Sequence, residues 1–346
     1  MNFSSDNVTP VCEPILAAVQ AANVDTVSSY GGDPLTQRLG RVFCELFERE
    51  VAVFPVATGT AANALSLSQL APPYGGIYCH ENAHIVTDEC GAPEFFTGGA
   101  KLLGLPGADG RIRAGQIAAG VAFAQDMGVH HVRPAAVSLT QATEWGTVYP
   151  RPLIAEIAAT AHAAGLGVHM DGARFANALA HLDCSPAEAT WKQGVDVLSF
   201  GATKNGALCA EAVVFFDPAK ALEFGQRRKR AGHLWSKMRF ISAQLLAYLQ
   251  DDLWLRNARN ANQMAGRLGA GLAAIRGVRL LQPVEANEIF AALPESMVVA
   301  LEKQGFGFYR WPLSAVQDAT PIRLVTSWAT RANEVEALLA AAGKLA

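Results

Sequence analysis

The sequence predicts an α/β fold, in which a large domain with a mainly parallel sheet precedes a small C-terminal α+β domain. Up to about residue 240, short apolar runs alternate with helical hydrophobic periods, the pattern of parallel strands joined by helices. Beyond that point a long helical stretch comes first and short strands follow. A chain of 346 residues is long enough for both domains, and we place them at residues 1–240 and 241–346.

Prolines mark two helix starts in the expected large domain. Asp33 followed by Pro34 is typical of an N-cap and a first helical residue, and the apolar residues after them share one helical face. Pro152 is expected to open a second helix, which Gly165 ends. The apolar runs predicted as strands are 51–56, 135–139, 167–170, 195–200 and 212–216.

The expected small domain begins with a helical stretch over residues 241–275, followed by predicted strands at 278–281, 289–292 and 321–327. No linker rich in proline or glycine separates the two domains. We therefore predict that a shared helix joins them.

Composition excludes several classes of protein. The net charge of -3 and a single local basic cluster at 227–230 argue against a nucleic-acid partner. No uncharged apolar run approaches the roughly 18 residues of a membrane span, and the first residues lack the pattern of a signal peptide. The six cysteines are scattered without a C-x-x-C pair, which favours reduced thiols over disulfides or a zinc site. We therefore expect a cytoplasmic protein.

A lysine and an aspartate follow two of the predicted strands. Lys204 stands in a turn of small residues after the run 195–200, and Asp171 directly follows the run 167–170. Pyridoxal phosphate (PLP) chemistry needs this pair, because the lysine forms a Schiff base and the carboxylate keeps the pyridine nitrogen protonated. The alternatives are an ordinary surface lysine and a structural pair between Asp171 and Arg174. Arg174, one turn further on, could also reach the cofactor or a substrate carboxylate.

A turn of small residues after the strand 51–56 offers a seat for phosphate. Gly59 and Thr60 open a predicted helix there, where backbone N–H groups and a hydroxyl point outward. A plain helix cap is the alternative reading. The chain has neither G-x-G-x-x-G nor a Walker lysine, so neither a dinucleotide nor a triphosphate is favoured.

The segment from His80 to His84 matches the letters of the zinc motif H-E-x-x-H. It lacks both an apolar helix around it and an obvious third ligand, so we predict no metal site. We expect His84 to stack on a planar cofactor ring, with a structural role as the alternative for both histidines.

Two segments carry arginines. Arg323 lies in a predicted apolar strand, where a substrate carboxylate is one candidate partner. The basic stretch 228–239 is either a solvated helix face or a source of phosphate contacts across a dimer interface.

Taken in order, these segments resemble the threonine aldolases, a branch of the fold-type I PLP enzymes of the aspartate aminotransferase superfamily. The resemblance covers nearly the whole chain, and segments 140–149 and 229–240 look like the low-specificity, Pseudomonas-type branch, which includes phenylserine aldolases. It rests on segments 4–7, 30–34, 58–60, 169–174 and 322–326 with His84, Ser199 and Lys204. The resemblance implies a seven-stranded sheet in the large domain.

The resemblance also implies roles for individual residues. Lys204 would form the Schiff base with PLP, His84 would stack on its ring, and Asp171 would pair with its pyridine nitrogen; these three are the expected catalytic residues. The phosphate would bind Gly59 and Thr60, and Arg230 and Arg239 from a neighbouring subunit. The substrate would contact Ser5, Tyr30, Arg174 and Arg323, of which Arg174 could also contact the cofactor. A homodimer or homotetramer with active sites at the subunit interface follows from these assignments.

The implied reaction is retro-aldol cleavage of L-threonine, L-allo-threonine or related β-hydroxy-α-amino acids to glycine and an aldehyde. Phenylserine aldolase, glycine hydroxymethyltransferase and aminotransferase activities are the alternatives. One departure concerns the base for the β-hydroxyl group. Many relatives carry a histidine in the segment that matches 141–144, and this chain has Gln-Ala-Thr-Glu there. His84, or a water molecule, would have to act instead.

Overall fold

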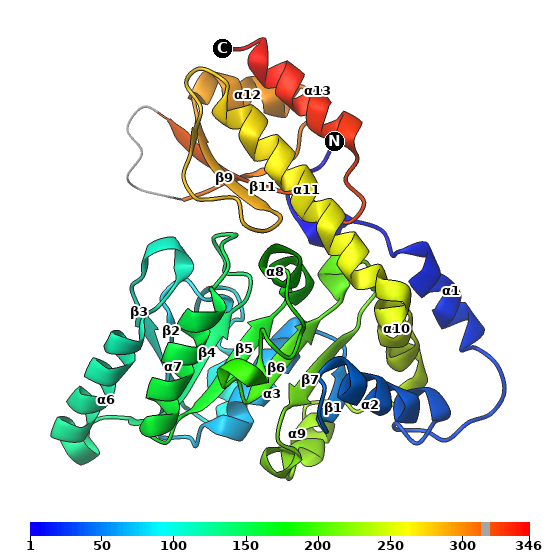
Figure 1. The fold of residues 1–346 in the computed structure, drawn as a ribbon, viewed down its shortest axis with the longest axis vertical. Coiled ribbons are helices and arrows are strands. Elements are labelled where there is room, and N and C mark those ends of the chain that lie inside the picture. Colours follow the sequence, from blue (N-terminus) through cyan, green and yellow to red (C-terminus); the bar gives the residue numbers. More distant parts are fainter. Residues whose placement is uncertain (313–318) are drawn as a thin grey trace.

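The structure is a computed structural model that describes residues 1–312 and 319–346. Figure 1 shows a large part built on one broad sheet and a small part that lies above it, joined on one side by α10 and α11. Both chain termini lie in the small part. Among the described residues, no helix is long and apolar enough to cross a membrane.

The predicted mainly parallel, seven-stranded sheet is confirmed, with the order β1-β7-β6-β5-β4-β2-β3. Only β7 runs antiparallel to its two neighbours. The strands are β1 (Ala52–Val56), β2 (Gly75–His80), β3 (Lys101–Leu105), β4 (Arg133–Thr140), β5 (Gly167–Gly172), β6 (Val197–Gly201) and β7 (Glu211–Phe215). The five strands predicted from apolar runs correspond to β1, β4, β5, β6 and β7.

Strands β2 and β3 were not predicted, because glycine lowers strand propensity at their most tightly packed positions. A Cβ atom on Gly76 would lie 2.9 Å from a methyl carbon of Leu103 and 3.0 Å from one of Val132. Glycine therefore allows β2 to approach its neighbours, while it removes the signal that identifies a strand in the sequence.

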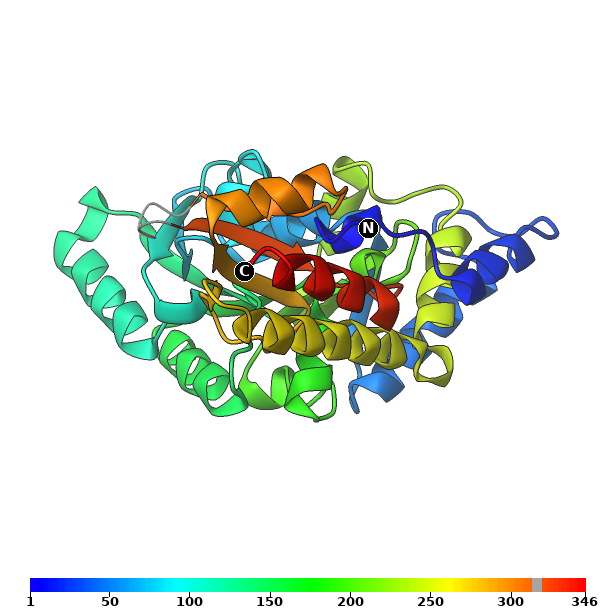
Figure 2. The ribbon, with the colours of Figure 1, turned by 90° about the horizontal axis from the view of Figure 1, so that it is seen from above.

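Helices cover both faces of the large sheet. Figure 2 shows α6, α7 and α8 on one side and the segment that contains α3 on the other. The Asp33 side chain accepts a hydrogen bond from Thr36 N–H, which confirms the predicted cap, and the second predicted helix begins at Arg151. The helices of this part are α1 (Glu13–Ala21), α2 (Pro34–Leu46), α3 (Gly59–Leu70), α4 (His84–Thr87), α5 (Ala92–Thr97), α6 (Ala114–Met127), α7 (Arg151–Ala163), α8 (Phe175–Leu182), α9 (Phe224–Arg230) and α10 (Arg239–Leu249).

The small part is an antiparallel sheet with three helices, as the α+β prediction requires. Its strand order is β10-β11-β9-β8, and α11, α12 and α13 pack on the side away from the large sheet (Figure 1). The elements are α11 (Leu253–Ala273), β8 (Arg279–Leu280), β9 (Glu288–Leu293), α12 (Glu295–Lys303), β10 (Tyr309–Arg310), β11 (Thr320–Val325) and α13 (Ala332–Gly343). The first residues of the chain also join this part, because Asn2 bridges to Gly307 and Phe3 lies in its core. The domain boundary at residue 240 stays a prediction.

The helical stretch predicted over residues 241–275 is divided into two helices, α10 and α11. A short 3-10 turn at Gln250–Asp252 separates α10 from α11. Asp251 and Asp252 adopt left-handed conformations, with φ of 50° and 54°, which no continuous α-helix contains. Aspartate tolerates this conformation better than most residues, so this acidic pair was the signal for the break.

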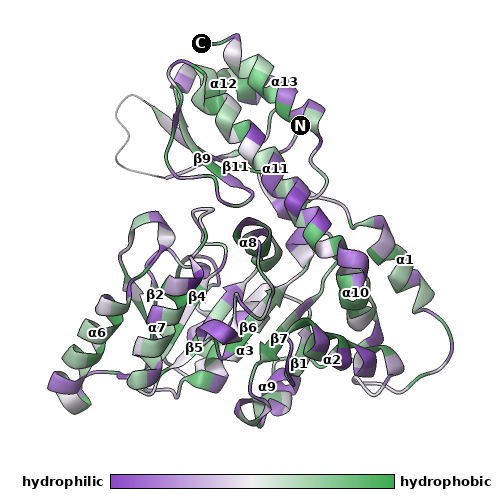
Figure 3. Ribbon diagram, viewed as in Figure 1, coloured by the Kyte–Doolittle hydropathy of each residue, from purple (hydrophilic) through white to green (hydrophobic). Residues whose placement is uncertain are grey.

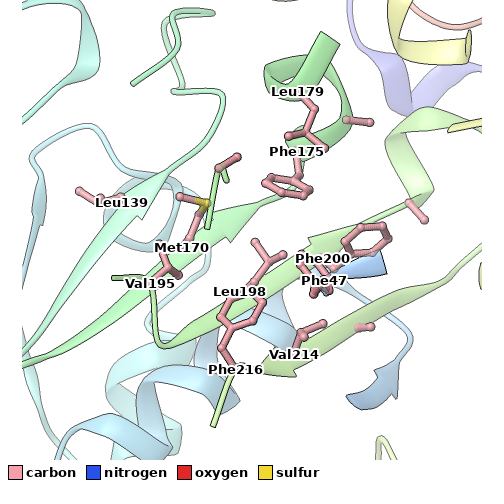
Figure 4. Packing of buried hydrophobic residues seen from close by; sticks show 14 of the residues in the cluster. Phe47, Leu139, Met170, Phe175, Leu179, Val195, Leu198, Phe200, Val214 and Phe216 are labelled. Atoms are coloured by element: carbon pink, nitrogen blue, oxygen red, sulfur yellow. The ribbon is translucent and has the colours of Figure 1, made fainter. Parts of the chain in front are cut away.

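The main core fills the space between the sheet and its helices. Figure 4 shows Phe175 and Leu179 of α8 above the strand residues Leu198 and Phe200. The Phe200 ring centroid lies 5.1 Å from that of Phe43 and 5.6 Å from that of Trp254. In Figure 3, α8 and β7, which both contribute to this core, are mainly green. This packing holds β6 rigidly just before the turn that carries Lys204.

We expect Phe200→Ala to lower the free energy of unfolding by about 3–5 kcal/mol, because it leaves a cavity in this aromatic cluster. Chemical denaturation followed by circular dichroism would measure the loss. Phe123→Ala on α6 is the control, because Phe123 is 55% exposed and surface changes usually stay within about 0.5 kcal/mol. Equal losses in the two variants would contradict the assignment of Phe200 to the core.

Candidate active site

A cavity of about 340 Å³ opens at the carboxyl ends of the parallel strands, the usual ligand edge of an α/β sheet. Its walls come from the turns after β1, β4, β5 and β6 and from α4. Six of the predicted site residues line it, namely Gly59, Thr60, His84, Asp171, Arg174 and Lys204. Residues far apart in the sequence thus meet in one place.

Lys204 lies in a short 3-10 turn that directly follows β6. The neighbouring Asn205 fixes this turn, since its amide donates hydrogen bonds to Tyr248 Oη at 2.8 Å and to the Trp254 carbonyl at 2.9 Å. Gly206 then takes a φ of 116°, which favours glycine. The hydrogen bonds to Tyr248 and Trp254 therefore anchor the turn, while Lys204 faces the cavity.

Asp171 is buried near the end of β5. Its Oδ2 accepts a hydrogen bond from the Asn63 amide at 2.8 Å, and its Oδ1 accepts one from Ala173 N–H at 2.9 Å. On the same strand, His169 lies between the hydroxyl groups of Ser138 and Ser199, and burial lowers the pKa of His169 to about 4. The strand that carries Asp171 is therefore held next to it by His169, a neutral side chain with two hydrogen-bonded partners.

The amino end of α3 faces the cavity. Thr58 caps the helix by accepting a hydrogen bond from Ala61 N–H. The first-turn N–H groups of Gly59 and Thr60 have no acceptor within the helix, as at every helix start. A Cβ atom built on Gly59 would have no other atom within 4 Å. Open space beside unpaired donors at a helix amino end suits a phosphate group.

His84 belongs to a series of hydrogen-bonded side chains. The sequence analysis predicted His84 but not the supporting residues Glu89 and Asn63. Its Nδ1 lies 2.9 Å from Oε1 of Glu89, and the Asn63 amide donates to the same oxygen at 2.8 Å. The hydrogen bond with Glu89 raises the pKa of His84. Asn63 thus links Glu89 to Asp171. An asparagine in the first turns of a predicted helix, close to the expected phosphate site, was the available signal for it.

Glu144 is a second residue whose role was missed, although it lies within the segment where a histidine was expected. Its Oε1 accepts hydrogen bonds from His84 N–H and from Thr140 Oγ1, both at 2.7 Å. Its Oε2 is buried and has no hydrogen-bond partner among the described residues. Burial raises the pKa of Glu144 to about 7.

A buried ionic cluster borders the cavity where the two parts of the molecule meet. Arg174 Nε donates to Asp6 at 2.8 Å, and Arg174 Nη1 lies 3.2 Å from Glu288 Oε2. Arg323 Nη1 lies 3.7 Å from Glu288 Oε1, and its Nη2 donates to the Ser4 carbonyl at 3.3 Å. Burial opposes ionisation of Asp6, but Arg174 holds the pKa of that carboxyl below its usual value.

Ser5 belongs to the same neighbourhood as this cluster, because it directly follows Ser4 and precedes Asp6. It is half-buried, and its hydroxyl accepts a hydrogen bond from Asn7 N–H. Neither Ser5 nor Arg323 lines the described cavity, whereas Arg174 does. The three residues predicted to contact a substrate carboxylate thus lie around one cluster at the edge of the cavity.

The other three predicted site residues lie away from the cavity of this single chain. Tyr30 is 50% exposed and has the Lys229 ammonium group over its ring. Arg230 is exposed at the end of α9, and Arg239 donates to the carbonyl groups of Val24 and Asp25. The residue of this segment that does reach the cavity wall is His233, whose ring accepts a hydrogen bond from Ala57 N–H.

His80 has the structural surroundings that the alternative reading assigned to it. Its Nδ1 accepts a hydrogen bond from Asn82 N–H, and its Nε2 lies 3.0 Å from the Gly107 carbonyl oxygen. In the described parts of the chain, no three histidine, cysteine, aspartate or glutamate side chains are grouped as metal ligands would be.

Comparison with known proteins decides the family. Residues 2–296 match the family described as Beta-eliminating lyase. The chain belongs to this family. It is 44% identical to the low specificity L-threonine aldolase of a Pseudomonas species (strain NCIMB 10558), over 98% of this chain and 96% of the relative. It is 47% identical to the Pseudomonas aeruginosa enzyme of that name, over 89% of this chain and 88% of the relative.

The fold agrees with that sequence similarity. The solved structure of Leishmania major threonine aldolase superposes with a TM-score of 0.93 at 29% identity, over 99% of each chain. Within the beta-eliminating lyases, the chain groups with the low-specificity L-threonine aldolases and is a PLP-dependent enzyme. The cavity fits PLP on structural grounds, since a lysine, a buried carboxylate and an open helix amino end face the same space.

We expect Glu89→Gln to lower the pKa of His84, because the neutral amide removes the negative charge that favours the imidazolium form. An NMR titration of the His84 ring would measure the shift. Glu81→Gln is the control, since Glu81 is an exposed glutamate close to His84 in sequence. The same His84 pKa in Glu89→Gln and in the unmodified protein would contradict the pairing.

Proposed function

We propose that this chain is an aldolase that cleaves L-threonine, L-allo-threonine or related β-hydroxy-α-amino acids to glycine and an aldehyde. The observation that carries the proposal is the meeting of Lys204, Asp171, His84 and the α3 amino end in one cavity, in a chain whose relatives are named threonine aldolases. Bound PLP would supply an electron-accepting ring that stabilises the charge left when the Cα–Cβ bond breaks.

Lys204 would bind the cofactor covalently, and its anchored turn supports that role because it holds the lysine backbone at the cavity wall. Asp171 would hold the proton on the ring nitrogen. The hydrogen bonds from Asn63 and Ala173 keep its carboxylate in one orientation. Gly59 and Thr60 would bind the phosphate group, and His84 would lie against the ring.

The substrate carboxylate would bind at the edge of the cavity near Arg174, with Arg323 and Ser5 in the same neighbourhood. Burial disfavours the charged form of Arg174, but Asp6 and Glu288 raise its pKa, so it stays cationic. Fixing the carboxylate there would hold the breaking bond in one direction relative to the cofactor, and orientation of this kind is a large rate term.

We further propose that the working form is a homodimer or homotetramer in the cytoplasm. Arg230, Arg239 and Tyr30 lie outside the cavity of their own chain, so their expected contacts would be made in a partner's site. The six cysteines are all free thiols, as a reducing compartment would keep them.

Enzyme assays distinguish the proposed aldolase from the alternative activities. An aminotransferase would need a keto acid, and a glycine hydroxymethyltransferase would need tetrahydrofolate. A cleavage panel of L-threonine, L-allo-threonine, their D-forms and phenylserine, with glycine and aldehyde both measured, would define the preferred substrate.

Lys204→Ala should abolish cleavage of L-threonine, because Lys204 is the lysine that lines the cavity among the described residues and the variant lacks an amine there to form the Schiff base. Borohydride reduction followed by mass spectrometry should find the cofactor on Lys204 in the unmodified protein and on no residue of the variant. Lys192→Ala, which removes a surface lysine paired with Glu48, should leave both measurements unchanged. Normal glycine production by Lys204→Ala would refute the assignment.

Asp171→Asn should keep much of the bound PLP but lower turnover by about 100-fold or more, because the amide cannot hold a proton on the ring nitrogen by charge. Cofactor absorbance and steady-state kinetics would measure the two effects separately. Near-normal turnover with bound PLP would disprove this role for Asp171.

A further inference from the structure

The proposed function leaves open which group takes the proton from the substrate β-hydroxyl. We propose that Glu144 is this base, an assignment that rests on the proposed aldolase function. Glu144 lies in the loop between β4 and α7, and it lines the cavity together with Lys204 and Asp171.

The two carboxyl oxygens of Glu144 have different surroundings. Oε1 accepts both nearby hydrogen bonds, from His84 N–H and Thr140 Oγ1, and these fix the position of the side chain. Oε2 is buried without a hydrogen-bond partner in the described part of the chain. Buried polar atoms without partners are rare, and each one calls for an explanation. A substrate hydroxyl is a suitable partner for this free oxygen.

The electrostatic surroundings suit proton transfer near neutral pH. Burial is the main reason why the pKa of Glu144 rises to about 7, and the negative charge of Asp171 adds to the effect. A base is most efficient when its pKa lies near the working pH. Other titratable or charged groups near Glu144 include His84, Arg174, Cys79 and Tyr149. Lys204, Glu89 and Glu211 line the same cavity.

His84 is less suited to this step. Its Nδ1 is already engaged with Glu89, and that hydrogen bond raises its pKa, which favours the imidazolium form. An imidazolium ion has no lone pair with which to accept a proton. His84 therefore positions Glu144 through its backbone N–H group, and its ring remains free to lie against the cofactor.

In the proposed step, Oε2 of Glu144 takes the β-hydroxyl proton. The O–H electron pair becomes the second bond of the aldehyde C=O group, and the Cα–Cβ bond breaks. The pair from that bond stays with Cα, which is later protonated to give glycine. In the reverse direction, protonated Glu144 returns its proton to the aldehyde oxygen.

The test compares Glu144→Gln with the unmodified holoenzyme. The amide oxygen of glutamine can still accept both hydrogen bonds, but the side chain can no longer take up a proton. We expect kcat for L-threonine cleavage to fall by about 100- to 10,000-fold. PLP content should be unchanged, and exchange of the glycine α-proton in D₂O, which involves no β-hydroxyl group, should stay within about threefold.

Glu285→Gln is the matched control, because Glu285 supports the same loop by accepting a hydrogen bond from Val148 N–H without lining the cavity. It should keep cleavage within about threefold. Loss of both cleavage and glycine exchange in Glu144→Gln would overturn the proposal, as would normal cleavage. If the unmodified enzyme cleaves no β-hydroxy amino acid, the proposed function itself fails.

A readout that does not depend on turnover is the pH dependence of thermal unfolding of the cofactor-free protein. Because the folded pKa of Glu144 lies above its unfolded value near 4.5, this group's stabilising contribution is complete at low pH and is lost as pH rises through about 7. The melting temperature of Glu144→Gln relative to the unmodified protein should therefore rise between about pH 5 and 8. A constant difference would count against the titration.

The identity of the titrating group is tested by two further variants. In the unmodified enzyme, kcat/KM should fall as pH drops below about 7. This fall is the acidic limb of the kcat/KM profile. Thr140→Val removes a hydrogen bond that lowers the pKa of Glu144, so the variant should shift the acidic limb to higher pH. Glu89→Gln alters His84 instead and should leave the limb in place. A limb that moves with Glu89→Gln and not with Thr140→Val would assign the base to His84.

Discussion

The crowding of carboxyl groups in one buried cavity constrains the rest of the site. Glu89, Glu144, Asp171 and Glu211 all line it, while Lys204 and Arg174 are the cations among its lining residues. Burying so many acids in a low-dielectric space is costly unless each is paired or protonated. The four acids differ in their hydrogen-bond partners and in their surroundings, and they therefore differ in their chemical properties.

Asn63 forms hydrogen bonds with two of these acids, Glu89 and Asp171. Its amide donates one hydrogen bond to each, so a neutral side chain lies between two carboxyl groups. In the described part of the chain, Glu144 and Glu211 form no ion pair, and burial raises the pKa of each to about 7. Glu144 and Glu211 can therefore exchange protons at neutral pH. An asparagine on α3 is therefore as important to this arrangement as the acids themselves.

Sequence reasoning identified the residues that contact the cavity from strand ends and from the helix amino end, because such positions follow from local patterns. Asp171 stands directly after a recognisable apolar run, and Lys204 and Gly59 follow such runs within a few residues. Their supporting residues could not be found in this way. Glu89 lies in no motif, and its position beside His84 depends on how the chain folds back after β2. Strand β2 itself escaped prediction, because the glycine that lets it pack closely also removes the strand signal.

The N-terminal segment connects both parts of the molecule to the cavity. Asn2 pairs with Gly307 of the small part, Asp6 pairs with Arg174, and Cys12 N–H donates to Gly206 beside Lys204. Buried ion pairs such as Asp6–Arg174 contribute little net stability, because desolvation offsets the attraction between the charges. Their geometry is nevertheless specific, since breaking the pair would leave a charge buried without a partner. The segment therefore acts mainly on arrangement, because its contacts fix the position of Arg174 relative to the turn that carries Lys204.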